Sequence, residues 1–123
     1  MQFRFKNNLF SFLPNPGRSK LTKDYFFTPI LIFLNILVFV VMAFDGVSIV
    51  SPEAEDLLKW GANDRTATLN GEFWRLFSCV FVHIGIVHLI LNLYALIFIG
   101  SILEPIIGKY KFIVGYLISG FIA

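Results

Sequence analysis

Charged residues and cysteine are both scarce in this sequence. Asp, Glu, Lys and Arg make up 15% of its 123 residues, whereas soluble domains average roughly 25%. Cys79 is the only cysteine, which excludes a disulfide within the chain, and we expect it to be a small apolar packing residue. The net charge of +2 gives no basis for predicting nucleic-acid binding. Because 57% of the residues are hydrophobic, the composition indicates a membrane protein.

Two long segments have no charged residue. Tyr25–Phe44 is long enough to cross roughly 30 Å of hydrocarbon as a helix. Leu76–Leu103, taken as one helix, would exceed a single crossing, so we predict that its first part belongs to the preceding loop. The second span then runs from about Ile84 to Leu103, with Gly85 near the join.

The end of the sequence predicts a turn and an incomplete span. We expect Glu104-Pro105 to stop the second helix, because proline interrupts helical hydrogen bonding. Gly108–Lys111 then forms a turn, and Phe112–Ala123 begins a third span. These last residues are too few to cross the bilayer, so we expect the sequence to be truncated.

The segment 45–72 is too polar to cross a membrane and holds most of the acidic residues. Ser51 is predicted to cap a helix that has Pro52 at its first position. Gly61–Asn63 is predicted to end that helix. We therefore expect a structured loop at the membrane surface.

Basic residues set the expected orientation. Five of them precede the first span: Arg4, Lys6, Arg18, Lys20 and Lys23. Because Lys and Arg concentrate on the cytoplasmic side, we predict a basic cytoplasmic tail at 1–24, followed by a transmembrane domain at 25–123. The loop is then external and the turn at Lys109 cytoplasmic. The aromatic residues of the tail leave open whether it is an interfacial segment or a flexible tail.

Two polar side chains, His88 and Asn92, interrupt the second apolar span. Being four residues apart, they project from one face of a helix. Polar groups are costly in hydrocarbon, and two donors that point the same way could stabilise a developing negative charge. The residues alone leave this open against an interhelical hydrogen bond, which is also what we expect of Asn35.

The sequence predicts no metal site and no cofactor. His83 and His88 are five residues apart, which separates them by about 140° around a helix, and a zinc site needs three or four ligands. His83 is instead expected to order the junction between the loop and the second span.

Other residues are expected to have structural roles. Trp60 and Trp74 are typical interface anchors, and Arg75 is expected to donate hydrogen bonds that tie the loop to the level of the headgroups. Close helix packing is expected at Gly100, Gly115 and Gly120.

Five short motifs occur in order between Trp60 and Glu104. They are Trp-Gly-Ala-Asn at 60–63, Glu-x-Trp-Arg at 72–75, Phe-x-His at 81–83, His-x-x-x-Asn at 88–92 and Gly-x-x-x-Glu at 100–104. A single His-x-x-x-Asn is a weak signal, whereas five ordered motifs are specific. With them, the segment from Phe27 to Ala123 resembles the N-terminal half of a rhomboid intramembrane serine protease.

The resemblance implies a six-helix bundle that cleaves transmembrane substrates within the bilayer by means of a Ser–His dyad. It implies that His88 and Asn92 stabilise the oxyanion of the tetrahedral intermediate. It also implies structural roles for Trp74, Arg75 and His83, and for Glu104 as a carboxylate that steadies the first external loop.

The nucleophile and base of that family are absent from this sequence. No Gly-x-Ser-Gly motif occurs; Ser119-Gly120 comes nearest, but position 117 is Leu. The sixth-helix histidine is absent too, so the catalytic serine and histidine are expected beyond the end of this chain, and this chain alone is expected to be inactive. Two hypotheses remain: part of a rhomboid-type serine endopeptidase, or a non-catalytic small membrane protein that binds other transmembrane helices.

The sequence thus predicts an all-α membrane protein: a partial rhomboid bundle with two spans, the start of a third and a structured first external loop. We expect a multi-pass position in a cell membrane, specifically a bacterial inner membrane. The expected partners are the lipid bilayer and transmembrane protein substrates, and the oligomeric state is left open.

Overall fold

The computed structural model describes residues 25–122, and this part of the chain forms six α-helices and no strand. The helices are α1 Phe27–Phe44, α2 Ala54–Lys59, α3 Arg65–Leu69, α4 Arg75–Ser78, α5 Gly85–Ile107 and α6 Lys109–Ile122. The predicted all-α class is confirmed. The tail predicted at 1–24 lies outside the described residues.

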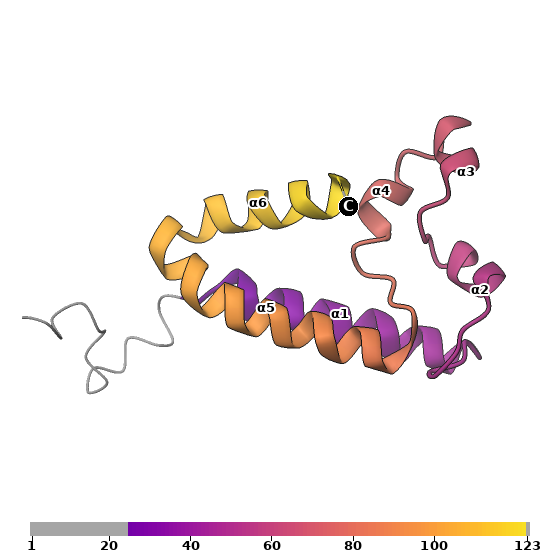
Figure 1. Cartoon of the computed structure of the whole chain (residues 1–123), viewed down its shortest axis with the longest axis horizontal. Coiled ribbons are helices and arrows are strands. Elements are labelled where there is room, and N and C mark those ends of the chain that lie inside the picture. The colour runs from indigo at the N-terminus through magenta and orange to yellow at the C-terminus, as the bar shows by residue number, and fades with distance from the viewer. Residues whose placement is uncertain (1–24, 123) are drawn as a thin grey trace, which may run out of the picture.

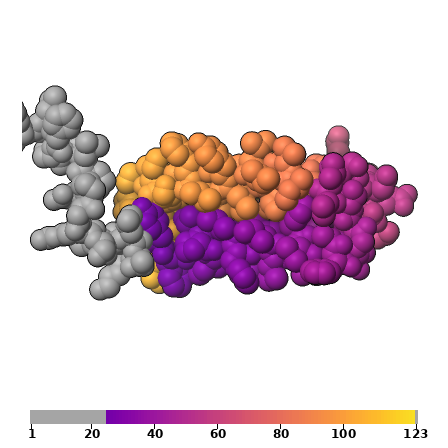
Figure 2. All heavy atoms as spheres, turned by 90° about the horizontal axis from the view of Figure 1, so that it is seen from below, coloured from indigo at the N-terminus to yellow at the C-terminus, as the bar shows by residue number. Residues whose placement is uncertain are grey.

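Three longer helices run along the molecule. In Figure 1, α1 and α5 lie antiparallel and α6 turns back over them, while α2, α3 and α4 gather at one end. Figure 2 shows α1 and α5 side by side along the long axis of the molecule. Both α1 and α5 are long and apolar enough to cross a membrane, as the sequence predicted. Many of their large apolar side chains are exposed, as expected of surfaces that face lipid.

The second long helix ends later than predicted. α5 continues through Glu104 and Pro105 to Ile107, so the expected stop at Pro105 is wrong. Proline lacks the N–H that would bond to the carbonyl four residues earlier. Here that carbonyl, on Ser101, accepts a hydrogen bond from the hydroxyl of Tyr25 at 3.0 Å. A donor from outside the helix therefore replaces the missing helical bond.

Gly108 alone makes the turn that was predicted over Gly108–Lys111. It has a φ of +85°, which only glycine adopts readily. α6 consequently begins at Lys109 rather than at Phe112. With 14 residues, α6 is shorter than a full bilayer crossing.

The loop between α1 and α5 is structured, as predicted, but its helices begin at other residues. α2 starts at Ala54 without a side-chain cap. The predicted cap at Ser51 is wrong, because Ser51 lies in a bend whose backbone N–H bonds to the Ser48 hydroxyl at 3.2 Å. α3 was not predicted; the Asp64 side chain caps it by accepting a bond from the N–H of Ala67 at 2.8 Å.

Arg75 joins the parts of this loop. Its Nη1 donates to the carbonyl oxygens of Leu58 and Ala62, at 2.7 and 3.1 Å. Its Nε donates to Glu72 at 2.6 Å, and its guanidinium lies 4.7 Å from the ring centroid of Trp74. Arg75 thus donates to the backbone of the loop itself, and its expected tie to the level of the headgroups stays a prediction.

Two clusters of buried apolar side chains hold these elements together. The first joins α1, α5 and α6 through Leu31, Leu96 and Phe112. The second joins the end of α1 to the loop through Met42, Val47 and Leu57. The clusters lie at different positions along α1, so both halves of that helix are anchored.

Of the three glycines expected at helix contacts, only Gly100 lies against another helix. A Cβ at Gly100 would lie 2.5 Å from the Thr28 hydroxyl on α1. A Cβ at Gly120 would lie 2.5 Å from Val80, which belongs to the loop after α4. Nothing lies within 4 Å of a Cβ at Gly115. The prediction is confirmed for Gly100 and wrong for Gly115.

Candidate functional site

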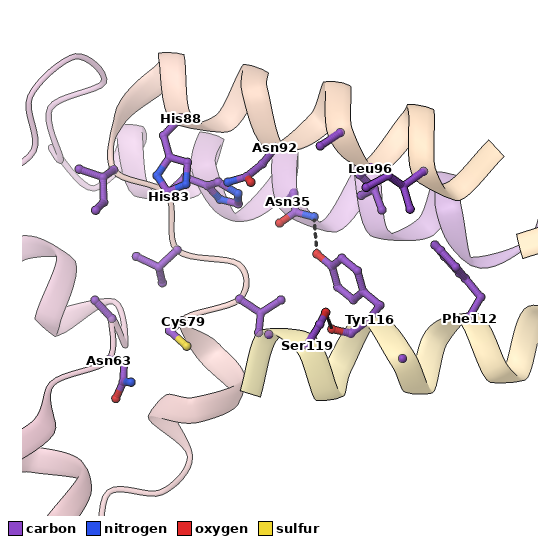
Figure 3. A pocket seen from close by; sticks show the side chains of 18 of the residues that line it. Asn35, Asn63, Cys79, His83, His88, Asn92, Leu96, Phe112, Tyr116 and Ser119 are labelled. Carbon is purple, nitrogen blue, oxygen red and sulfur yellow. Dashed lines mark hydrogen bonds between the residues drawn. The ribbon is translucent and has the colours of Figure 1, made fainter. Parts of the chain in front are cut away.

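A cavity of about 780 Å³ lies between the α1–α5 pair, α6 and the loop (Figure 3). Most of the residues that line it are apolar. Its polar lining comes from all of these elements and comprises Asn35, Asn63, Cys79, His83, His88, Asn92, Tyr116 and Ser119. Polar side chains within an otherwise apolar helical assembly are the usual mark of a functional site in a membrane protein.

His88 and Asn92 both line this cavity from α5. The structure thus places them on one face of the helix, as their spacing predicted. Both residues are exposed, and neither side chain makes a hydrogen bond within residues 25–122. Their N–H donors are therefore available to a group that enters the cavity.

His83 packs against His88 and is only 3% exposed. The two imidazole rings meet edge to face, with centroids 5.6 Å apart and planes at 70°. The predicted separation of about 140° around one helix is wrong, because His83 belongs to the loop and α5 begins only at Gly85. Among residues 25–122, no group of three or more His, Cys, Asp or Glu could hold a metal ion.

The surroundings of His83 favour its neutral form. Burial lowers the pKa of the imidazole; the contact with the Phe81 carbonyl partly opposes this, and the nearby His88 adds to it. The Nδ1 atom lies 3.0 Å from that carbonyl oxygen, which can only accept, so Nδ1 carries the proton. The His83 carbonyl in turn accepts a bond from the N–H of Gly85 at 3.0 Å. These contacts support the expected role of His83 in ordering the start of α5.

Asn35 and Tyr116 extend the polar lining away from the loop. Asn35 Nδ2 donates to the carbonyl of Leu31 at 2.7 Å and to the hydroxyl of Tyr116 at 3.4 Å, and Figure 3 shows this second bond between α1 and α6. The interhelical bond predicted for Asn35 is therefore present. Tyr116 was not identified from the sequence, because a tyrosine on an apolar helix gives no signal until its partner is known.

Glu104 lies at the opposite end of α5 and is 1% exposed. Its carboxylate accepts bonds from the N–H groups of Phe26, Phe27 and Thr28, at 2.8, 2.7 and 2.9 Å, and from the Thr28 hydroxyl at 2.6 Å. The first N–H groups of a helix lack helical partners, and the N-cap residue Phe26 has no acceptor side chain to offer. Glu104 therefore caps α1 from another helix.

The expectation that Glu104 steadies the external loop is wrong. The loop gathers at the other end of the α1–α5 pair (Figure 1), too far along the helices for this carboxylate to reach. The acceptor is needed where α1 begins, and the antiparallel packing of α1 and α5 brings Glu104 there. Thr28, which makes two of the four bonds, was not identified from the sequence.

Neither Cys79 nor Ser119 is arranged as a nucleophile, although both line the cavity. Burial raises the pKa of the Cys79 thiol, which disfavours the reactive thiolate. The Ser119 hydroxyl donates to the Tyr116 carbonyl of its own helix at 2.8 Å. Within residues 25–122 it makes no bond to a histidine that could act as its base.

The fold and the cavity define an all-α membrane protein with a polar site among its apolar helices. Sequence comparisons then identify the family. The family model of the Rhomboid domain matches residues 70–123. Rhomboid protease GluP of Bacillus subtilis (strain 168) is 36% identical over 94 residues, which cover 76% of this chain and 18% of that protein. The chain belongs to the rhomboid family and is related to its intramembrane proteases.

Relatives from plants show the same similarity. RHOMBOID-like protein 1 of Arabidopsis thaliana is 39% identical over 74 residues, which cover 59% of this chain and 19% of that protein. Inactive RHOMBOID-like protein 8 of the same plant is 37% identical over 60 residues, 49% of this chain and 17% of that protein. This chain spans less than a fifth of each, and because one is inactive, similarity in this region does not establish activity. No solved structure matches the chain.

Proposed function

We propose that this chain supplies the oxyanion-binding part of a rhomboid-type intramembrane serine endopeptidase that cleaves transmembrane protein substrates. His88 and Asn92 donate hydrogen bonds to the oxyanion of the tetrahedral intermediate. The 123 residues contain no Gly-x-Ser-Gly motif. The proposal therefore assigns the serine and its histidine base to residues outside this sequence, and the 123-residue chain alone is inactive.

One observation carries the proposal: two neighbouring donors line a cavity without hydrogen-bond partners. A His or Asn that served only to join helices would bond to a neighbouring helix, as Asn35 does with Tyr116. His88 and Asn92 line the cavity from α5 and make no such bond within residues 25–122. Donors that are held in place and are not already bonded within the protein are what an oxyanion requires.

The surrounding structure supports the positions of these donors. The ring of His83 packs against that of His88 and limits its orientation. Trp74 and Arg75 hold the loop that closes one side of the cavity. Glu104 fixes α5 against α1. Accurate placement matters because a displacement of about 1 Å can cost on the order of 10² in rate.

The proposed setting is a multi-pass position in a bacterial inner membrane. Residues 1–24 form the basic cytoplasmic tail of a partial rhomboid transmembrane domain at 25–123. The antiparallel α1 and α5 support this orientation, because they put the acidic loop and the turn before Lys109 at opposite ends (Figure 1). The loop and the His88 end of the cavity then face the external side.

The test measures cleavage of a transmembrane reporter by the product of the complete gene in proteoliposomes. We expect His88→Ala with Asn92→Ala to lower kcat by about 10²–10³ with little change in KM, because the lost donors act on the transition state. Ile90→Ala is the matched control: Ile90 is 56% exposed on the same helix and does not line the cavity.

Two outcomes would count against the proposal. Unchanged kcat in the double variant would refute the oxyanion role of His88 and Asn92. If the complete gene product neither reacts with a fluorophosphonate probe nor cleaves the reporter, the endopeptidase function itself fails. The non-catalytic alternative, a membrane protein that binds other transmembrane helices, would then stand.

A further inference from the structure

The chain turns at Gly85, where the loop meets α5. Gly85 has a φ of +84°, a conformation that residues with a side chain rarely adopt. Its N–H bonds to the His83 carbonyl at 3.0 Å. If α5 continued back through this point, His83 would lie about 140° around the helix from His88. Because of the turn, the two imidazole rings instead meet edge to face, with centroids 5.6 Å apart (Figure 3).

The space beside Gly85 is filled by the backbone of another segment. A Cβ on Gly85 would lie 2.7 Å from the carbonyl oxygen of Val50 and 3.4 Å from that of Ile49. The neighbouring N–H of Ile86 donates to the Ile49 carbonyl at 2.7 Å, so the backbone at 49–50 is bonded to the first turn of α5. A backbone carbonyl cannot rotate away as the end of a side chain can. A methyl group at position 85 would therefore push the two segments apart.

This arrangement distinguishes Gly85 from the other left-handed glycines within residues 25–122. At Gly46, Gly71 and Gly108 nothing lies within 4 Å of a Cβ, and at Gly61 the nearest atoms belong to side chains. Among these residues, position 85 alone combines a left-handed backbone with close contact to the backbone of another segment.

The segment that fills this space also reaches His83. Val47, Ser48 and Ile49 surround a narrow gap together with His83. Val47 belongs to the buried cluster that joins the end of α1 to the loop, so this segment is anchored. The backbone at 49–50 and the ring of His83 thus lie together against the start of α5.

We propose that Gly85 is a positioning residue for His88. Its left-handed turn and missing side chain let the backbone at 49–50 dock on α5 and let His83 fold onto the His88 ring. His88 makes no hydrogen bond within residues 25–122, so its orientation depends on packing, and the His83 ring is the group that it meets edge to face. The consequence for catalysis rests on the proposed function, whereas the positioning of the ring does not.

The first test compares crystal structures of the complete gene product grown in a lipidic mesophase. In Gly85→Ala we expect the two imidazole rings to separate, because the methyl group displaces Val50 or forces the backbone out of its left-handed conformation. Gly108→Ala is the matched control, since it imposes the same backbone cost at a φ of +85° where nothing lies within 4 Å of the Cβ. It should keep the ring contact. A ring contact that persists in Gly85→Ala would overturn the proposal.

Cleavage of a transmembrane reporter gives the second readout. Gly85→Ala should lower kcat by about 10²-fold, since a displacement of about 1 Å is enough for such a loss. KM should change little, because an oxyanion donor acts on the transition state, and Gly108→Ala should leave both constants unchanged. If the rings separate and kcat stays the same, the positioning role stands and the oxyanion role of His88 in the proposed function is refuted.

Two further measurements apply if Gly85→Ala does not fold. Gly85→Asn accepts a left-handed φ more readily than alanine but keeps the Cβ that meets Val50, so it should also lose the ring contact. In the wild type, amide hydrogen exchange followed by NMR in detergent micelles should be slow at Ile86 and fast at Val87, whose N–H has no acceptor among residues 25–122. An intact ring contact in Gly85→Asn, or equal exchange at the two amides, would contradict the docking of 49–50 on α5 and with it the proposal.

Discussion

The polar residues at the two ends of α5 differ in whether their hydrogen-bond partners come from the protein. At one end Glu104 is almost fully buried and accepts four hydrogen bonds, all from the start of α1. At the other end His88 and Asn92 line a cavity and make no hydrogen bond within residues 25–122. The same helix thus carries one polar group whose bonding is complete and two whose bonding is open.

This difference separates a polar group that the fold itself uses from polar groups that remain open to a ligand. A polar group with every partner supplied by the protein stabilises the fold and has nothing left for a ligand. Donors that face a cavity without partners stabilise nothing by themselves and remain available for binding. Position along an apolar helix does not distinguish the two cases, whereas the presence or absence of hydrogen-bond partners within the protein does.

The largest expected effect comes from removing the acceptor at the Glu104 end of α5. Glu104→Ala should lower the free energy of unfolding by more than about 3 kcal/mol, because two buried and two partly buried donors lose their acceptor, at about 1–3 kcal/mol for each buried one. Asn92→Ala, at the open end, should change it by less than about 0.5 kcal/mol. Unfolding of both variants in mild detergent measures the contrast. Equal losses in the two would show that the ends do not differ as described.

A matched pair of glycine variants sharpens the comparison. A Cβ at Gly100 would lie 2.5 Å from the Thr28 hydroxyl that bonds to Glu104, whereas nothing lies within 4 Å of one at Gly115, beside the cavity. Gly100→Val should therefore cost about 1–3 kcal/mol of stability by overpacking, and Gly115→Val much less. The same unfolding assay applies, and a larger loss in Gly115→Val would contradict this packing.

The smallest expected effect is a pH dependence of stability caused by His83, which packs against His88 at the start of α5. The folded structure lowers the pKa of His83 below its ordinary value of 6.5, so between these two values the unfolded chain binds more protons. The free energy of unfolding should therefore be highest above about pH 6.5. It should fall as the pH drops from there toward the lower pKa of His83 in the folded state. Unfolding at a series of pH values measures the slope.

His83→Phe is the variant for that measurement, because it keeps an aromatic ring against His88 and removes the titrating group. We expect it to flatten the pH dependence, whereas Glu55→Ala, an exposed change in α2, should leave it intact. A slope that stays the same in His83→Phe would assign the titration to another group.

Apolar patterning predicted much of this fold. Composition and helical spacing predicted the two spans and the shared face of His88 and Asn92. They also predicted that the first part of the second uncharged segment belongs to the loop and that the helix starts near Gly85. The errors fell where a distant residue supplies a bond. Pro105 failed to end α5 because the hydroxyl of Tyr25 bonds to the carbonyl that the proline leaves free, and no local rule contains that donor.

The sequence by itself determined the family and the helical class, and it gave the two residues proposed to donate to an oxyanion, because ordered motifs and apolar periodicity are local properties. Only the tertiary structure decided which polar groups are satisfied. It showed that Glu104 caps α1, that His83 meets His88, and that Asn35 shares the cavity with Tyr116. Each of these depends on how antiparallel helices and a loop pack together, which spacing within one segment cannot specify.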